Sequence, residues 1–243
     1  MLHIGVIDPE VLGTYGDTGN ALILASRAKR RGIDAQIHSI HLDEPIPTSM
    51  DIYVMGGGED SAQALAAEHL RKSADFRRVI ERGTPLLAIC ASMQILGKWY
   101  VDAHDNRVTG VELLDITTEP QGTRSIGELL SQPILPELTH TLTGFENHGG
   151  GTSLGGDARP LATVTCGKGN GGTWENGEPE QAYEGVVQGS IISTYMHGPV
   201  LARNPELADL LLCRATGQQS LPEIAMPLVD QLREERLHAA RNH

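Results

Sequence analysis

Cys90 has the sequence surroundings of a reactive thiol. It follows the apolar run 85–89 and precedes a segment, 91–97, whose spacing predicts a helix. At such a strand-to-helix turn, the free N–H groups of the helix start face the sulfur and favour the thiolate. The neighbours Ala88 and Ser92 are small, as a sharp turn requires. We therefore expect Cys90 to act as a nucleophile and the Ala91 amide to be one donor of an oxyanion hole. A buried core cysteine is the plainer alternative, and we keep it for Cys166 and Cys213.

Three consecutive glycines, 56–58, follow the strand-like run 52–55. Their backbone can approach a ligand closely and donate N–H groups to an oxyanion, so Gly57 and Gly58 are candidates for the rest of the hole. A glycine turn after a strand is often only a turn. The lysine and spacing of a Walker A phosphate loop are absent, so nucleotide binding is not predicted.

His197 ends a third strand-like run, 190–196, and is followed by Gly198 and Pro199. A single histidine at a strand end is usually structural. Paired with Cys90, however, its imidazole could take the thiol proton and later protonate a departing amine. The pair would then be a nucleophile and its acid/base.

The elements around these residues predict an α/β fold. Strand-like runs at 2–7, 35–40, 52–55 and 85–89 alternate with helical patterns at 20–31 and 62–82, which indicates a mostly parallel sheet flanked by helices. Between about 101 and 189 glycine and proline become frequent, with strand-like runs at 111–116 and 161–165 and an exposed loop or hairpin tip at 167–179, so this half should be more antiparallel. Asn204 and Pro205 predict the cap and first residue of a helix, and an amphipathic helical stretch follows Pro227.

Composition excludes several classes of function. The chain has 243 residues and a formal net charge of -12, which argues against binding a polyanionic nucleic acid. It contains no long apolar run and no amino-terminal signal pattern, so we expect no transmembrane segment and a cytoplasmic location. Three widely spaced cysteines predict neither a disulfide framework nor a zinc ribbon, and no metal site is expected.

The order of these signals resembles the class I (triad-type) glutamine amidotransferases, and in particular their cobyric-acid-synthase-like branch. The resemblance covers most of the chain and is carried by five separated motifs, namely 15–20 (YGDTGN), 56–60 (GGGED), 122–127 (GTRSIG), 144–149 (GFENHG) and 195–198 (YMHG). It implies a flavodoxin-like fold in a single glutaminase domain, 1–243, with a carboxy-terminal amphipathic helical extension at 225–243. By motif, Arg124 would hold the carboxylate of substrate L-glutamine, for which a guanidinium is well shaped, and Gln94 would contact the same substrate.

Within that branch the likeness is greatest to the glutaminase subunits of lipid II isoglutaminyl synthases. This implies a heterodimer with a Mur-ligase-like (MurT-like) synthetase, which would use the released ammonia to amidate the α-carboxylate of D-glutamate in the stem peptide of lipid II at the inner membrane face. The chain itself would carry no cofactor, with ATP and Mg²⁺ on the partner.

The sequence departs from the wider family at one position of mechanistic importance. Triad-type enzymes commonly have Glu two residues after the histidine, where this chain has Pro199. Either a backbone carbonyl orients His197, or an acidic group comes from elsewhere, for instance from the partner. Three other functions remain open: amidation of another acceptor such as a corrinoid, a non-enzymatic regulatory subunit, and a free-standing cysteine hydrolase.

Overall fold

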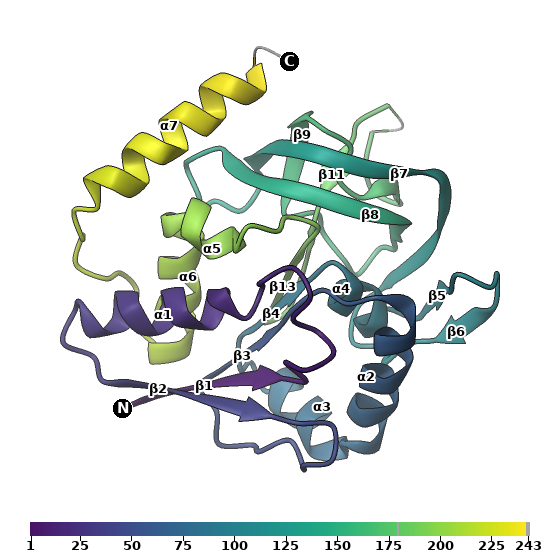
Figure 1. Cartoon of the computed structure of the whole chain (residues 1–243), viewed down its shortest axis with the longest axis horizontal. Helices are drawn as coiled ribbons and strands as arrows, with labels where there is room; N and C mark the ends of the chain where they lie inside the picture. The colour runs from purple at the N-terminus through teal and green to yellow at the C-terminus, as the bar shows by residue number, and fades with distance from the viewer. Residues whose placement is uncertain (179, 242–243) are drawn as a thin grey trace.

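Two β-sheets and seven helices form the structure, a computed structural model that describes residues 1–178 and 180–241. Figure 1 shows the first sheet in the lower part of the molecule, with helices on both sides, and the second sheet above it. One continuous apolar core joins residues of both. The expected α/β architecture, parallel in its first half and more antiparallel in its second, is confirmed.

The first sheet has the order β12-β13-β4-β3-β1-β2, and only the pairing of β12 with β13 is antiparallel. The central strands are buried on both faces, as their nearly continuous apolar sequences predict. The strands are β1 (Leu2–Ile7), β2 (Ala35–Ile40), β3 (Ile52–Met55), β4 (Leu86–Ile89), β12 (Val186–Gln188) and β13 (Ile191–Thr194).

Helices cover both faces of this sheet (Figure 1). On one side lie α1 (Gly19–Lys29), α5 (Val200–Arg203) and α6 (Pro205–Thr216). On the other lie α2 (Asp60–Lys72), α3 (Ala74–Glu81) and α4 (Ala91–Leu96). Because β1, β3, β4 and β13 run in the same direction, the loops after them meet at one edge, where ligands bind in folds of this type.

The second sheet is built around the long antiparallel pair β7 (Ile116–Pro133) and β8 (Leu142–Leu154). Their register breaks between Pro120 and Ser125, where the chain bulges. The other strands are β5 (Trp99–Val101), β6 (Arg107–Thr109), β9 (Ala162–Cys166), β10 (Gly171–Trp174) and β11 (Tyr183–Glu184). An isolated bridge pairs Phe145 of β8 with His197, so this sheet reaches the ligand edge of the first one.

The expected strand at 111–116 is wrong, because only its last residue is in a strand. Val111 and Leu113 instead donate their N–H groups to the carbonyls of Ile95 and Leu96. These carbonyls end helix α4 and would otherwise lack partners, so the apolar segment caps a helix.

Two helix predictions differ in detail from the structure. Asn204 stands before Pro205 as expected, but its side chain bonds to both backbone groups of Thr143 and leaves the helix N–H groups alone. The last helix, α7, spans Pro227–Arg241 and leaves Leu228 80% exposed. The segment 167–179 includes β10 within its turns, and Pro179 lies outside the described residues, as do the last two residues of the expected extension at 225–243.

Candidate active site

Cys90 sits on a strained turn between β4 and α4. Its φ of 51° and ψ of -106° are unusual for a residue with a side chain, and such strain gathers at functional sites. The Cys90 N–H donates to the carbonyl of Thr194 (2.8 Å), which fixes the turn against β13. The expected strand-Cys-helix geometry is therefore present, and it places the side chain at the ligand edge of the sheet.

The environment of the Cys90 thiol holds it in the protonated form. Burial, and then the negative charge of Asp17, raise its pKa to about 12, while the Ala91 amide and Arg124 act in the opposite direction. The Ala91 amide at the helix start favours the thiolate, as the sequence suggested, but burial and Asp17 outweigh it. Ionisation of Cys90 requires a base that takes its proton.

Strand pairing places His197 at the same sheet edge as Cys90. β13 and β4 are parallel, with Thr194 opposite Ile89, so the residues that follow both strands emerge at the same edge. Nδ1 of His197 lies 2.9 Å from Oδ2 of Asp17, whereas Nε2 is buried and has no hydrogen-bond partner among the described residues. Cys90 is thus not hydrogen-bonded to His197 in this structure, and Nε2 is the nitrogen left to accept a proton.

Asp17 supplies the carboxylate that the sequence around Pro199 lacks. It lies in the loop between β1 and α1, is fully buried, and is 180 residues from His197 in the chain. In the sequence Asp17 stands out only as part of the motif 15–20, with no sign of a role of its own. A carboxylate on Nδ1 holds the proton there, which leaves Nε2 as the base, as in Ser-His-Asp triads. The acidic group comes from this chain and from an unexpected loop.

Gly57 is closely packed against the other residues of the site. A Cβ on Gly57 would lie 2.9 Å from Cε1 of His197 and 3.2 Å from Oδ2 of Asp17. The Gly57 N–H donates to that same Asp17 oxygen (2.9 Å), so it is engaged in this structure, and its oxyanion role stays a prediction. Gly58 lines the cavity beside Cys90, and the oxyanion roles of Gly58 and Ala91 stay predictions.

A cavity of about 220 Å³ opens above Cys90. This is smaller than the roughly 300–1,000 Å³ of sites for drug-sized ligands and suits a small metabolite. Its walls come from both sheets and the loops between them, and they include Tyr15, Glu59, Gln63, Cys90, Gln94, Asp102, Thr118, Arg124, Asn147, His148 and Gly150. The fold thus brings Arg124 and Gln94 to the nucleophile, as the resemblance implied.

Arg124 and Gln94 differ in how they are held. Arg124 is exposed; its Nε donates to Asn147 (2.7 Å) and its Nη2 to the hydroxyl of Tyr15 (3.3 Å). Gln94 is buried, accepts from Gln63 (2.8 Å) and donates to the hydroxyl of Tyr195 (3.0 Å). Arg124 can therefore turn toward a ligand, whereas Gln94 is fixed in a network. Their substrate contacts stay predictions.

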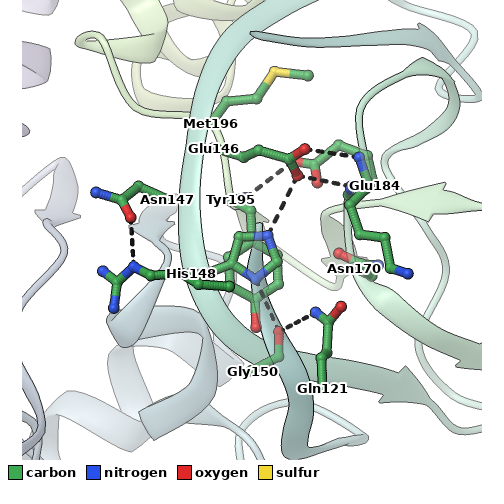
Figure 2. Close-up of polar contacts among 12 residues, drawn as sticks. Gln121, Glu146, Asn147, His148, Gly150, Asn170, Glu184, Tyr195 and Met196 are labelled. Carbon is green, nitrogen blue, oxygen red and sulfur yellow. Dashed lines mark hydrogen bonds and ion pairs between the residues drawn. The ribbon is translucent and has the colours of Figure 1, made fainter. Parts of the chain in front are cut away.

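Behind the cavity lies a buried polar network that sequence analysis did not identify (Figure 2). The ring of His148 stacks on Tyr195, with centroids 3.7 Å apart. Nδ1 of His148 faces the Gly150 carbonyl (2.8 Å), and Nε2 faces Glu146 (3.4 Å). Glu184 accepts from the N–H of Tyr195 (3.0 Å), and burial raises the pKa of its carboxyl to about 7. The network connects the cavity wall to the second sheet.

No other part of the described chain offers a comparable centre. Cys166 and Cys213 are free and lie away from the cavity, so their structural assignment needs no revision. Within residues 1–178 and 180–241 no group of three potential ligands could hold a metal ion. None of the helices described there is long and apolar enough to cross a membrane.

Comparisons with known proteins agree with this geometry. Residues 3–205 match the model of the CobB/CobQ-like glutamine amidotransferase domain. A lipid II isoglutaminyl synthase (glutamine-hydrolyzing) subunit GatD of Staphylococcus aureus is 37% identical over 213 residues, which are 87% of this chain and 83% of that protein. The subunit of the same name from Streptococcus pneumoniae is 32% identical and covers 95% of this chain and 86% of its own length. Cobyric acid synthases match over a smaller part, such as one from Methanothermobacter thermautotrophicus, 32% identical over 61% of this chain.

Solved structures confirm the fold. A crystal structure of a glutamine amidotransferase has a TM-score of 0.56 at 20% identity and covers 88% of this chain and 98% of its own. The glutaminase domain of Trypanosoma brucei CTPS, solved with bound acivicin, has a TM-score of 0.53 at 9% identity and covers 93% and 98%. From the matched domain and these relatives, the chain belongs to the CobB/CobQ-like glutamine amidotransferase family.

Proposed function

We propose that this chain is the glutaminase subunit of a lipid II isoglutaminyl synthase and that it releases ammonia from L-glutamine for a Mur-ligase-like synthetase. The observation that carries the chemistry is the strained Cys90 at the same sheet edge as a histidine that has a buried carboxylate on Nδ1 and a bare Nε2. The acceptor is supported by the two relatives of that name, which match 87% and 95% of the chain.

The reaction would proceed through a thioester. Nε2 of His197 takes the proton from Cys90, and the thiolate attacks the side-chain carboxamide carbon of glutamine. The resulting oxyanion would be held by the amides of Ala91 and Gly58. The C–N bond then breaks while the imidazolium returns the proton to nitrogen, so that ammonia leaves. Water, deprotonated by His197, hydrolyses the γ-glutamyl thioester to glutamate and restores the thiol.

Asp17 would stabilise the imidazolium that forms in both halves of this cycle. In the resting chain its negative charge raises the pKa of the Cys90 thiol, but once His197 is protonated the same charge is neutralised by the adjacent ring. Proton transfer would thus become favourable only when sulfur and Nε2 approach each other. We propose that binding of glutamine, or of the synthetase, brings about this approach, which would keep the isolated subunit slow.

The synthetase would hold ATP and Mg²⁺ and would carry out the amidation of D-glutamate in the stem peptide. We place this chain in the cytoplasm, where the complex would act on lipid II at the inner membrane face. Amidation of a different acceptor by the same glutaminase site would leave the chemistry at Cys90 unchanged.

Reconstitution with the synthetase tests the proposal. The purified chain is mixed with the Mur-ligase-like protein, lipid II, ATP and Mg²⁺, and transfer of label from glutamine carrying ¹⁵N in its side-chain amide is followed by mass spectrometry. Cys90→Ala should abolish this transfer and leave amidation from ammonium chloride intact. Transfer of glutamine nitrogen by the Cys90→Ala complex would exclude Cys90 as the nucleophile, and unmodified lipid II in both reactions of the wild-type complex would exclude this acceptor.

A further inference from the structure

The cavity above Cys90 has charges of both signs at its mouth. Its charged side chains are Arg124, Glu59 and Asp102. If Arg124 holds the carboxylate of an amino acid, the α-ammonium on the same carbon must also find an acceptor, because a charge left without one is costly. One of the two carboxylates could meet that need.

Both carboxylate oxygens of Asp102 already accept hydrogen bonds within its own turn. Its Oδ1 accepts the N–H groups of His104 and Asn106, each at 2.9 Å, and its Oδ2 accepts the side-chain amide of Asn106 (3.3 Å). These bonds shape the turn between β5 and β6. Moving Asp102 toward a ligand would break them, so it is poorly suited to the ammonium.

Glu59 is free to bind a cation. It follows the glycines 56–58 directly, is exposed, and among the described residues accepts one hydrogen bond, from the Tyr15 hydroxyl to Oε1 (3.1 Å). Its second oxygen has no hydrogen-bonded side chain or backbone group in that part of the chain. An ammonium at this position would meet a carboxylate that Tyr15 orients through one oxygen, while the other oxygen is still available as an acceptor.

Tyr15 sets the spacing between the two opposite charges. Its hydroxyl donates to Glu59 and accepts from Nη2 of Arg124 (3.3 Å), so both charged groups lie within 3.3 Å of one phenol oxygen. The carboxylate and ammonium of an α-amino acid are attached to one carbon and so span a similarly short distance. The ring of Tyr15 also packs against His197, with centroids 4.7 Å apart, which ties this pair of charges to the catalytic edge.

We infer that Glu59 binds the α-ammonium of the substrate, with Tyr15 as its positioning residue, and that the site thereby selects a zwitterionic amino acid over a simple ω-amide acid. The inference rests on the proposed glutaminase function and adds the group that recognises the amine. It predicts that Glu59 contributes to binding, while the chemical step at Cys90 proceeds without it.

Binding to the Cys90→Ala chain tests the inference without turnover. Calorimetry compares L-glutamine with glutaramate, which is the same molecule without its α-amino group. Glu59→Gln should weaken the binding of L-glutamine about tenfold or more, the loss of a charge-assisted hydrogen bond, and leave that of glutaramate unchanged or tighter. Glu68→Gln is the matched control: it makes the same charge change on an exposed residue of the same α2 segment, outside the cavity, and should alter neither.

The possible results separate the two proposals. Equal effects of Glu59→Gln on both ligands, or no effect on either, would overturn the role of Glu59 and leave the glutaminase assignment standing. Failure of the Cys90→Ala chain to bind L-glutamine, both alone and with the synthetase, would overturn both. In the otherwise wild-type enzyme, Glu59→Gln should raise KM for glutamine about tenfold with kcat nearly unchanged, whereas an equal loss in kcat would contradict a binding role.

Discussion

His197 and His148 are both buried next to a carboxylate, yet only one is arranged as a base. His148 faces acceptor oxygens on both sides, the Gly150 carbonyl and Glu146. His197 has Asp17 on Nδ1 and no hydrogen-bond partner on Nε2 in the described chain. Both nitrogens of His148 thus point at protein acceptors and neither faces a reacting group, whereas Nε2 of His197 has no protein partner and can receive a proton from one. The comparison shows that the useful feature of a buried histidine is its unsatisfied nitrogen.

A third histidine supports the same distinction. Nδ1 of His69 contacts Asp8 (2.7 Å), and Nε2 contacts the carbonyl of Glu44 (2.8 Å), so this ring is also saturated. Asp8 and Asp17 belong to the same loop after β1, and each holds one histidine from a distant element. His69 and His148 would thus serve structure, and His197 would serve chemistry.

The largest effect should come from removing the base. His197→Asn should lower kcat of the glutaminase by roughly 10³-fold, within the range usual for general acid–base groups, because no other histidine in the described chain has a buried ring nitrogen without a partner. The melting temperature should change little. Steady-state kinetics and a thermal melt measure both. If His69→Asn lowers kcat as much, the assignment of the base to His197 alone is wrong.

Removing the carboxylate on Nδ1 should have the next largest effect. In Asp17→Asn the amide can donate to Nδ1, which moves the ring proton to Nε2 and blocks proton uptake; a comparable change in a serine protease costs about 10⁴-fold. We expect a loss of roughly 10²–10⁴ in kcat with an intact fold. Asp8→Asn makes the same change beside His69 and should alter stability while kcat stays near wild type. Full activity of Asp17→Asn in the complex would mean that another group orients His197.

The local patterns of the sequence were enough to predict where Cys90 and His197 lie in the fold. Each follows a buried strand of the parallel sheet, and such strands are recognisable in the sequence as short apolar runs. The motif residues Arg124 and Gln94 also fall at the cavity. The predicted positions agree with the structure because the parallel pairing of β13 with β4 brings the ends of distant strands to one edge.

Residues in irregular segments could not be placed in the same way. Asp17 lies in a loop with no periodicity, and its contact with His197 joins positions 180 apart. The only signal was its occurrence in the motif 15–20. The hydrogen bond from the Gly57 N–H to Asp17 could not be predicted for the same reason. The run 111–116 has the composition of a strand, but its N–H groups donate to the unpaired carbonyls at the end of α4 and not to a neighbouring strand.

Replacing His148, whose two ring nitrogens both face acceptor oxygens, should affect stability more than rate. His148→Phe keeps an aromatic ring against Tyr195 but leaves Glu146 without its contact to Nε2, although Glu146 still accepts from the N–H groups of Lys168 and Gly169. Leaving a buried carboxylate without one of its hydrogen-bond partners costs roughly 3 kcal/mol. Urea unfolding should show a loss of that order, with kcat within about tenfold of wild type. A loss of kcat as large as that of His197→Asn, without loss of stability, would assign His148 to the chemistry.

The smallest effect should be a pH dependence of stability that comes from the network around His148 and leaves the catalytic edge untouched. Burial raises the pKa of the Glu184 carboxyl from 4.5 to about 7. The folded chain therefore binds a proton that the unfolded chain releases near its ordinary pKa. Stability from this group is present below about pH 4.5 and is lost as pH rises through about 7, by roughly 3 kcal/mol.

Glu184→Gln should remove that dependence. The amide oxygen can still accept from Thr194 and Tyr195, as Oε1 of Glu184 does, and no charge forms at high pH. Urea unfolding at pH 5 and pH 8 should show a fall in stability for the wild-type chain that is steeper than that of the variant, which should be the more stable of the two at pH 8. Parallel pH profiles for the two proteins would mean that Glu184 is ionised across this range, and the network behind the cavity would then carry a charge that His148 balances.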